Sequence, residues 1–468
     1  MARLWEKALV ERLNSRGAAV SIRYIDGFKA RGRCLDTILR IESLRFGPSL
    51  ASRTLPLPET GAGAADLVID LTGAAGPQDA PVLTIDICGQ TDLSRGVAAM
   101  LASRQAPVLV TRLDGVAVGR GLPMPGDPIW LSRACDTLLS GAISLTLQGA
   151  ARHFAGRLAP LDGEIAREPE HRFLGAYLRS VAAGAVKRCR EKISRGKRPF
   201  YWQVAYRQVD GPGVAEAAKV EGAPFVTLPD DGTRFYADPF VFEREDRHYL
   251  FVEEFPYAKG YGIISVAELM ADGCFSVPKP VIEEPHHLSY PQVFEIAGEV
   301  FMIPESAAAR DVVLYRAEDF PHRWVRDTVL LSDVDFNDAT LLQSGGRFWL
   351  FGTERFGHGS ASDTMAVYSA PSLRGPYEPH PLNPIAIDRS AARPGGAFIR
   401  RGEALFLPVQ DGSRAYGGGL GLMELLRLDM DEVVFGPVRP VEAGSAWQRR
   451  GIHTLNRAGR VEVIDSAG

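Results

Sequence analysis

The sequence predicts two domains of different class: a degenerate, Rossmann-like α/β domain over residues 1–185, and an all-β five-bladed β-propeller over residues 201–468. Three observations support this prediction. The chain of 468 residues is too long for one ordinary hydrophobic core. Its first half contains short apolar runs separated by Gly- and Ala-rich loops. After residue 235, a pattern of a strand, a Gly turn and an aromatic strand repeats about every 50 residues, which is typical of a propeller.

The N-terminal half opens with an amphipathic pattern at residues 3–16, which predicts a helix, and we expect a strand at residues 18–22 directly after it. Three further apolar runs, at residues 67–71, 82–87 and 107–111, are typical of buried parallel strands. The first half is therefore predicted to be α/β.

An Ala- and Leu-rich segment at about residues 130–190 predicts helix and leads into the most basic part of the chain. Seven of the twelve residues from Lys187 to Arg198 are Lys or Arg. One interpretation of residues 186–200 is a solvated helix end and interdomain linker. The other is contact with an anionic membrane surface or a phosphorylated lipid, where each basic residue contributes roughly 1 kcal/mol.

Four blades fit between about residues 230 and 440. The polar residue that leads each first strand is expected to face a common central cavity. The four opening segments are residues 236–240, 289–294, 337–342 and 393–398. The fifth blade is predicted to combine both ends of the domain, residues 451–456 and 461–465 with 201–206, because such closure removes the exposed sheet edge.

Composition excludes several classes of function. A formal charge of −4 and the lack of a basic patch interleaved with aromatics in the propeller argue against nucleic-acid binding. The five cysteines have neither paired nor metal-ligand spacing, so we predict no disulfide framework and no metal site, and a reducing, cytoplasmic compartment. No apolar run of 18 residues occurs, and no cofactor motif is found: the Gly417–Gly419 run lacks the flanking residues of a phosphate loop.

Three acidic residues are expected to point into the central cavity: Asp238, Glu305 and Asp338. Glycoside cleavage needs one protonated and one ionised carboxyl group, separated by roughly 5 to 9.5 Å. If the protein is an enzyme, Asp238 is the expected general base and Glu305 the candidate acid. Alternatively, Asp238 caps the turn at Pro239 and Asp338 ends a tight loop.

Arg393 is predicted to clamp an anionic group, because guanidinium binds carboxylate or phosphate through two parallel hydrogen bonds. A structural ion pair with Asp411 or Asp338 is the alternative. The other candidate substrate-binding residues are Gln410, Asp411, His453, Tyr290 and Glu254.

The motif Ala237-Asp238-Pro239-Phe240, together with Asp338, resembles the five-bladed propellers of arabinanases and xylosidases. This resemblance implies that the two aspartates act as general base and pKa-tuning partner. Those enzymes carry a general-acid Glu at the start of blade four, where this chain has Arg393. The implied hydrolase therefore lacks its proton donor, unless Glu305 or Glu354 substitutes.

A closer resemblance covers the propeller half. The motifs that carry it are Tyr236-Ala237-Asp238-Pro239-Phe240, Glu253-Glu254 with Gly262-Ile263-Ile264, Ser289-Tyr290-Pro291, Pro304-Glu305-Ser306, Arg393-Pro394-Gly395-Gly396, Pro408-Val409-Gln410-Asp411 with Tyr416-Gly417, and Gly451-Ile452-His453-Thr454-Leu455. They resemble the N-terminal domain of glucosamine inositolphosphorylceramide transferases and its stand-alone bacterial relatives. In the plant enzymes that domain precedes a separate glycosyltransferase domain, and nothing resembling the latter follows in this sequence.

The N-terminal half is weakly similar to a formyltransferase-type domain around residues 66–71. Such enzymes rely on an Asn-His pair, whereas residues 86–92 read Asp-Ile-Cys-Gly-Gln-Thr-Asp, so formyl transfer is not expected. The chain also starts with a helix where that fold starts with a strand, so the domain is expected to be trimmed or to begin upstream.

We therefore expect a propeller that recognises or processes a carbohydrate in bacterial surface-polysaccharide or glycolipid assembly. The alternatives are a non-catalytic scaffold that holds a glycosyltransferase partner or an anionic lipid, and a glycoside hydrolase with a rearranged general acid.

Overall fold

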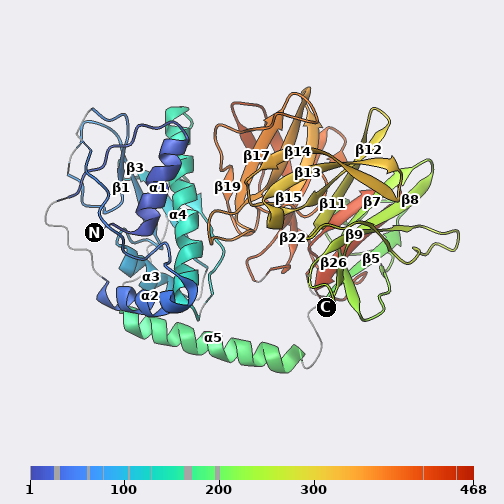
Figure 1. Ribbon diagram of the computed structural model, residues 1–468, viewed down its shortest axis with the longest axis horizontal. Helices are drawn as coiled ribbons and strands as arrows, with labels where there is room; N and C mark the ends of the chain where they lie inside the picture. Colours follow the sequence, from blue (N-terminus) through green and yellow to red (C-terminus); the bar gives the residue numbers. More distant parts are fainter. Residues whose placement is uncertain are drawn as a thin grey trace. The chain divides into compact units, whose positions relative to one another are not determined.

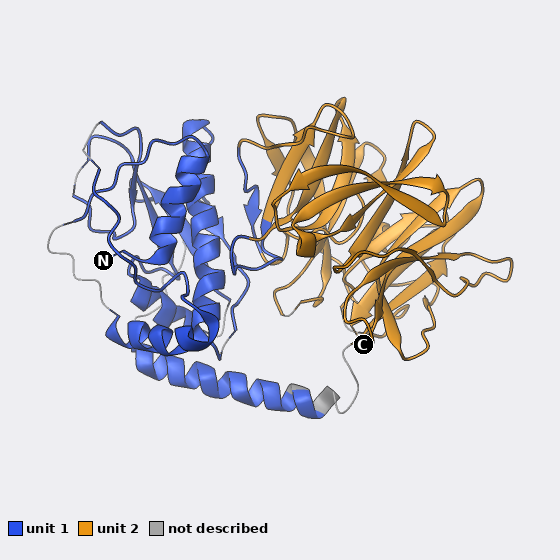
Figure 2. Ribbon diagram, viewed as in Figure 1, with its two compact units in different colours: residues 1–197, 356–364, 382–388 blue, residues 198–355, 365–381, 389–468 orange. Residues whose placement is uncertain are grey.

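The computed structural model describes residues 2–25, 32–60, 64–76, 78–103, 106–127, 129–162, 171–195, 201–414, 416–449 and 451–467. Two compact units make up the chain (Figure 2). Unit 1 comprises residues 1–197, 356–364 and 382–388, and unit 2 comprises residues 198–355, 365–381 and 389–468. Unit 1 thus includes two segments that the sequence analysis placed in the propeller. Residues 196–200 of the predicted basic linker lie outside the described residues.

Unit 1 consists of five helices and one four-stranded sheet over its described residues (Figure 1). The helices are α1 (Leu4–Ser15), α2 (Arg33–Phe46), α3 (Leu93–Ala102), α4 (Leu131–Phe154) and α5 (Phe173–Arg195). The strands, in sheet order, are β1 (Val68–Asp70), β2 (Val82–Ile87), β3 (Leu109–Leu113) and β4 (Val116–Gly121). Helix α4 contacts β2, β3 and β4 and is buried along most of its length, so it forms the centre of this core.

Two of the sequence predictions for this half need correction. Only β1 and β2 run parallel, whereas β2, β3 and β4 are antiparallel neighbours, so the Rossmann-like prediction is not confirmed. The hairpin between β3 and β4 turns at Asp114-Gly115, both at positive φ, as a two-residue hairpin requires. Residues 18–22 form no strand, since the segment is largely exposed and has no sheet to join. The N-terminal helix is confirmed by α1, and the predicted helix at 130–190 is two helices, α4 and α5.

Segments 356–364 and 382–388 are bound to α4 inside unit 1. The buried amide of Gln148 donates to the carbonyl oxygens of Pro384 and Ile385 at 2.7 and 2.9 Å. The hydroxyl of Ser140 donates to the Phe356 carbonyl at 3.2 Å. Among the described residues, no helix is both long and apolar enough to cross a membrane.

The described residues of unit 2 form five antiparallel sheets. The first has β7 (Arg234–Arg244), β8 (Arg247–Pro256), β9 (Ile263–Glu268) and β10 (Lys279–Ile282), and the second has β11 (Ser289–Ile296), β12 (Glu299–Glu305), β13 (Asp311–Asp319) and β14 (Arg323–Ser332). The third has β15 (Phe336–Ser344), β16 (Arg347–Glu354), β17 (Thr364–Ala370) and β18 (Glu378–Pro379), whereas the short strand β19 (Ala386–Ile387) falls in segment 382–388 of unit 1. The fourth has β20 (Ile399–Arg401), β21 (Ala404–Gln410), β22 (Leu420–Leu428) and β23 (Val433–Phe435), with β24 (Arg439–Pro440). The fifth joins β25 (Leu455–Ala458) and β26 (Val461–Ala467) to β5 (Trp202–Gln208) and β6 (Val226–Thr227), so it is built from both ends of the unit. A short helix α6 (Val214–Ala217) and a turn of 3₁₀ helix (Ala307–Ala309) complete unit 2.

Apolar side chains pack each sheet against the next. Separate clusters join the first sheet to the second, the second to the third, the fourth to the fifth, and the fifth to the first. Phe351 of the third sheet contacts Phe398 and Phe435 of the fourth, with ring centroids 4.9 and 6.0 Å apart. The five sheets therefore form a closed ring. In every sheet the first two strands are joined by a two-residue turn, which accounts for the repeated Gly turn in the sequence.

Candidate functional site

Three first strands carry the same distortion at the centre of the ring. Register shifts lie between Ala237 and Phe240, between Ser289 and Gln292, and between Asn337 and Thr340. At each bulge one residue that is not glycine has left-handed backbone: Asp238 at φ 48°, Tyr290 at φ 46° and Asp338 at φ 53°. Such residues cost of order 1–3 kcal/mol each and concentrate at functional sites. These bulges are therefore candidates for positions that hold site residues.

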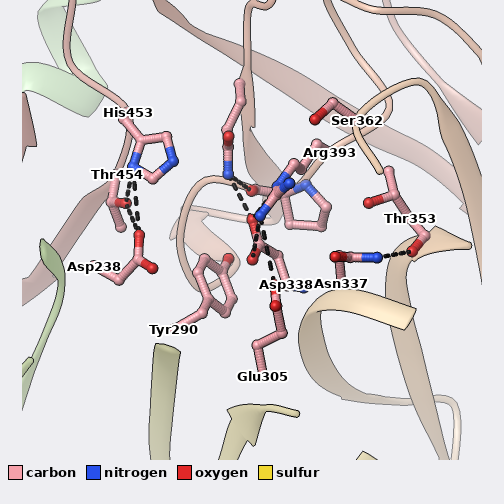
Figure 3. A network of polar contacts seen from close by, with 12 residues as sticks. Asp238, Tyr290, Glu305, Asn337, Asp338, Thr353, Ser362, Arg393, His453 and Thr454 are labelled. Carbon is pink, nitrogen blue, oxygen red and sulfur yellow. Dashed lines mark hydrogen bonds and ion pairs between the residues drawn. The ribbon is translucent and has the colours of Figure 1, made fainter. Parts of the chain in front are cut away.

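Asp338 is held by a buried arginine. Arg393 donates from Nε and Nη2 to the two carboxylate oxygens of Asp338, at 2.6 and 3.1 Å (Figure 3). The Gln410 amide donates to the same carboxylate at 2.6 Å. Arg393 Nη2 also reaches Glu305 Oε2 at 3.4 Å. The geometry thus matches the ion-pair alternative for Arg393, with Asp338 as the partner. In this structure a carboxylate of the chain itself binds the guanidinium.

A second network centres on His453, which is fully buried. Its Nδ1 lies 3.2 Å from Asp465 Oδ2 and 3.3 Å from Asp238 Oδ1. Its Nε2 lies 3.1 Å from the hydroxyl of Tyr416, whose ring is half exposed. Thr454 donates to Asp238 Oδ1 at 3.1 Å (Figure 3). The arrangement is a carboxylate, imidazole and phenol in series, which links the buried centre to a side chain that reaches solvent.

The two networks differ in charge. Burial raises the pKa of Asp238 to about 7, although the neighbouring His453 opposes this. Burial and the charge of Asp338 hold the pKa of Glu305 well above its ordinary range. Burial alone would raise the pKa of Asp338, but the Arg393 guanidinium lowers it below its usual value. Burial acts in the opposite sense on the imidazole of His453 and would lower its pKa. The charges of Asp465 and Asp238 outweigh burial, so the pKa of His453 lies above its usual value. The centre therefore favours the ionised form of Asp338 and the neutral form of Glu305.

Glu253 and Glu254 of β8 are both buried but have different surroundings. Glu254, a predicted substrate-binding residue, pairs with Arg234 and accepts from Ser265 at 2.6 Å. Glu253 senses the charge of Asp238, and burial holds its pKa well above its usual range. Alternation along β8 separates the two, because successive side chains of a strand point to opposite faces.

Two further predicted residues have structural contacts. Tyr290 is fully buried, and its hydroxyl lies 3.0 Å from Thr340 Oγ1 and accepts from the Gly396 amide at 2.7 Å. Its ring is therefore not open for stacking on a sugar. Asp411 accepts from the Ser413 amide at 2.9 Å and shapes the loop that leads to Tyr416.

Glu253, Asp465 and Thr454 also belong to the centre and were not among the predicted site residues, and the hydrogen bond between Tyr416 and His453 was not predicted. Asp465 lies in a strand that had been predicted, and alternation could have marked Glu253. Nothing in the local sequence of Tyr416 signals its bond to His453.

Ligand atoms of Asp238, His453 and Asp465 all lie within 4.8 Å of one another, so these three residues could hold a cation. The same atoms already bond to each other and to Thr454. Two backbone amides also donate to Asp465, that of Asp238 at 2.9 Å and that of Thr454 at 2.8 Å. A metal would have to replace part of this network.

A closed ring of antiparallel sheets around a shared polar centre defines unit 2 as a β-propeller. The model of the family "Glucosamine inositolphosphorylceramide transferase 1, N-terminal" matches residues 220–460. The chain belongs to this family, which confirms the resemblance seen in the motifs.

Two plant relatives illustrate the similarity. Glucosamine inositolphosphorylceramide transferase 1 of Oryza sativa subsp. japonica is 33% identical over 247 residues, covering 50% of this chain and 33% of the relative. The Arabidopsis thaliana protein of the same name is 32% identical over 205 residues, covering 43% and 26%. The chain thus spans about a third or less of the length of these relatives.

Solved structures with a similar fold share little sequence with this chain. An exo-beta-1,3-galactanase from Clostridium thermocellum is 11% identical with a TM-score of 0.39, covering 50% of this chain and 59% of that one. A family 62 α-L-arabinofuranosidase from Coprinopsis cinerea is 12% identical with a TM-score of 0.38, covering 56% and 85%.

Proposed function

We propose that unit 2 is a five-bladed propeller, with one blade per sheet, that binds a sugar-containing ligand at its polar centre. Family membership supports a carbohydrate role, since the relatives are named for glucosamine and a phosphorylceramide lipid. The setting we propose is the assembly of a surface polysaccharide or a glycolipid.

We further propose that the centre cleaves or transfers a glycosidic bond, with Asp238 as general base and Glu305 as general acid. One observation carries this proposal: buried Asp238 has a pKa raised to about 7, close to the pH at which a general base works best, while burial and the charge of Asp338 raise the pKa of Glu305, as a general acid requires. Glu305 donates its proton to the leaving oxygen as the bond to the anomeric carbon breaks. Asp238 takes a proton from the incoming water or sugar hydroxyl, which forms the new bond.

In this mechanism Asp338 is a positioning residue rather than a nucleophile. Its oxygens accept from Arg393 and Gln410, and its charge raises the pKa of Glu305. Arg393 stands where arabinanase-type propellers carry their acid, so the acid role falls to Glu305 on the second sheet.

The test combines binding and turnover on one panel of glycans and nucleotide sugars. Thermal shift records binding, and mass spectrometry records product. Asp238→Asn and Glu305→Gln are compared with Asp333→Asn and Glu245→Gln, matched changes at side chains that are exposed. We expect product from the wild type and the controls, and shifts without product from the two central variants.

The outcomes separate the proposals. Shifts with no product from the wild type would reject catalysis and leave a sugar-binding module, or a scaffold for a glycosyltransferase partner. No shift with any sugar would reject carbohydrate binding itself.

A further inference from the structure

Helix α5 exposes a stripe of apolar side chains that the core of unit 1 leaves uncovered. Leu174, Leu178 and Val186 are 53%, 59% and 51% exposed, and Ile193 is 80% exposed. Leu174, Leu178, Ala182 and Val186 follow one another at intervals of four, and Ile193 comes two turns later. Residues at these intervals lie on one side of a helix. The stripe therefore runs almost the full length of α5.

The other side of α5 is anchored. Helix α5 contacts α3 and α2, and it lies along the edge of unit 1 beside α2 (Figure 1). Ala176 and Gly184 are buried, and Phe173 and Tyr177 pack against the main core of the unit. The exposed stripe is thus held in place by a folded domain, and α5 is not a frayed end.

Basic side chains border the stripe. Each residue of a helix is rotated by 100° from the one before it. This rotation places the exposed Arg179 and Arg190 on one side of the stripe and the exposed Lys192 on the other. The sequence of α5 contains six basic residues and one acidic residue, a formal charge of +5 in a chain whose total is −4. Of the basic residues, Arg188 is paired with Asp127 at 2.5 Å within unit 1.

Apolar and basic groups also meet in a shallow hollow on the same helix. Its volume is about 500 Å³, and it is lined by Ala182, Ala183, Val186, Lys187 and Arg190. Small side chains at two adjacent positions leave room beside the longer basic ones. An apolar chain and an anionic group could occupy such a hollow together.

We propose that α5 is an interfacial helix that lies on an anionic lipid bilayer. An exposed apolar stripe with Arg and Lys along its borders is the pattern of a helix that lies in the plane of a membrane surface. The apolar groups enter the boundary of the acyl chains, while the long basic side chains extend to the headgroups. A protein partner that covered the same stripe would have to supply acidic groups on both sides, whereas an anionic bilayer supplies them everywhere.

Vesicle co-sedimentation of the full chain tests this inference. One set of vesicles is pure phosphatidylcholine, and the other contains about 30% phosphatidylglycerol, which supplies the negative surface potential. We expect binding to the anionic set only, and weaker binding as salt rises, because charges are screened within roughly 10 Å at 0.1 M salt.

Paired variants separate the two contributions. Leu178→Ala is expected to lower the partition coefficient about tenfold, since three carbon groups are removed from a side chain of which 59% is exposed and can enter the bilayer boundary. Arg179→Gln and Arg190→Gln are each expected to lower it about fivefold, the equivalent of roughly 1 kcal/mol per charge. Val277→Ala and Arg323→Gln, at exposed positions of unit 2, are the matched controls and should bind like the wild type.

Three results would overturn the proposal: no binding to anionic vesicles, equal binding to both kinds of vesicle, or α5 variants that behave like their controls. Sedimentation velocity without lipid tests the alternative that a second copy of the chain covers the stripe. If the wild type self-associates and Leu178→Ala abolishes this, the stripe is a protein interface instead. Circular dichroism of each variant confirms that unit 1 remains folded, which is expected because all three changed side chains are exposed.

Discussion

Replacing Arg393 by Gln should destabilise unit 2 by about 3–5 kcal/mol at pH 7, because it leaves a buried carboxylate without its cation. The two hydrogen bonds between Arg393 and Asp338 are 2.6 and 3.1 Å long, and Asp338 is only 1% exposed. Gln410 still donates to Asp338, but an amide cannot neutralise the charge. For a domain of this size, 1 kcal/mol corresponds to about 2–4 °C, so we expect the Tm to fall by at least about 6 °C.

The pH dependence provides a second, independent signature. In the wild type Arg393 lowers the pKa of Asp338, so this group stabilises the fold at pH values above its unfolded pKa, and the benefit is lost as the pH falls through its folded pKa. Without the arginine, burial raises the pKa of Asp338, so the folded variant binds the proton that the unfolded chain releases. The stability gap between the two proteins should therefore widen from pH 4 to pH 7. Glu253 titrates in both proteins and largely cancels from the difference. Glu305 also loses the cation that lowers its pKa, and this change widens the gap in the same direction.

Urea unfolding followed by tryptophan fluorescence measures this gap, since Trp202, Trp324, Trp349 and Trp447 lie in unit 2. The control is Arg323→Gln, whose 3.0 Å pair with Glu318 is exposed and should contribute less than about 1 kcal/mol. Adding Asp338→Asn to Arg393→Gln should recover part of the loss, because it removes the stranded charge. If Arg393→Gln costs no more than the control, or costs the same at pH 4 and pH 7, the ion-pair argument is wrong.

Four other substitutions test the rest of the centre. The Tm of Asp238→Asn should rise relative to that of the wild type as the pH increases from 5 to 8. The reason is that a carboxyl group with a folded pKa of about 7 destabilises the wild-type fold when it ionises, whereas Asn does not titrate. A Tm difference that stays constant over this range would contradict the prediction. Glu253→Gln should leave the free energy of unfolding at pH 7 within about 1 kcal/mol, because burial raises the pKa of Glu253 and favours its neutral form, which Gln imitates. Glu254→Gln should cost about 1.5–3 kcal/mol by weakening its hydrogen bond with Arg234. Urea unfolding would show the reverse order if the two faces of β8 were misassigned. Gly396→Ala should lower the Tm by several degrees, because the new Cβ would lie 2.1 Å from the Leu455 carbonyl oxygen at a φ of 149°; an unchanged Tm would mean that the backbone there relaxes freely.

The sequence predicted those features of unit 2 that repeat, because repetition makes a weak local signal visible several times. Polar residues that open the first strands led directly to Asp238 and Asp338, and both lie in the centre. Complementary segments at the two ends of the unit led to the closing sheet, which β5, β25 and β26 form. Unit 1 has no such repetition. Its apolar runs were identified as strands, but an apolar run does not show which way a strand runs against its neighbour, and β2 and β3 pair antiparallel.

Side-chain partners in the centre could not be predicted, since they depend on the backbone at single positions. Arg393 could have bound an external anion or a residue of the chain, and only the fold brings Asp338 within 2.6 Å. Likewise, Tyr416 and His453 are 37 residues apart, and their contact depends on the course of the 411–419 loop.

The β-bulges explain why carboxylates of the centre that are proposed to act in catalysis also stabilise the fold. At two of them the amide of the left-handed residue is bound by an acid from a neighbouring sheet: Asp238 N donates to Asp465 at 2.9 Å, and Asp338 N donates to Glu305 at 3.3 Å. Glu305 therefore joins two sheets as an acceptor, in addition to its proposed role as an acid. Glu305→Gln keeps an acceptor oxygen and loses only the proton, whereas Glu305→Ala loses both. If the proposal is right, the Gln variant keeps the stability of the wild type and loses turnover, and the Ala variant loses both; a Gln variant that keeps turnover would leave Glu305 with the structural role alone.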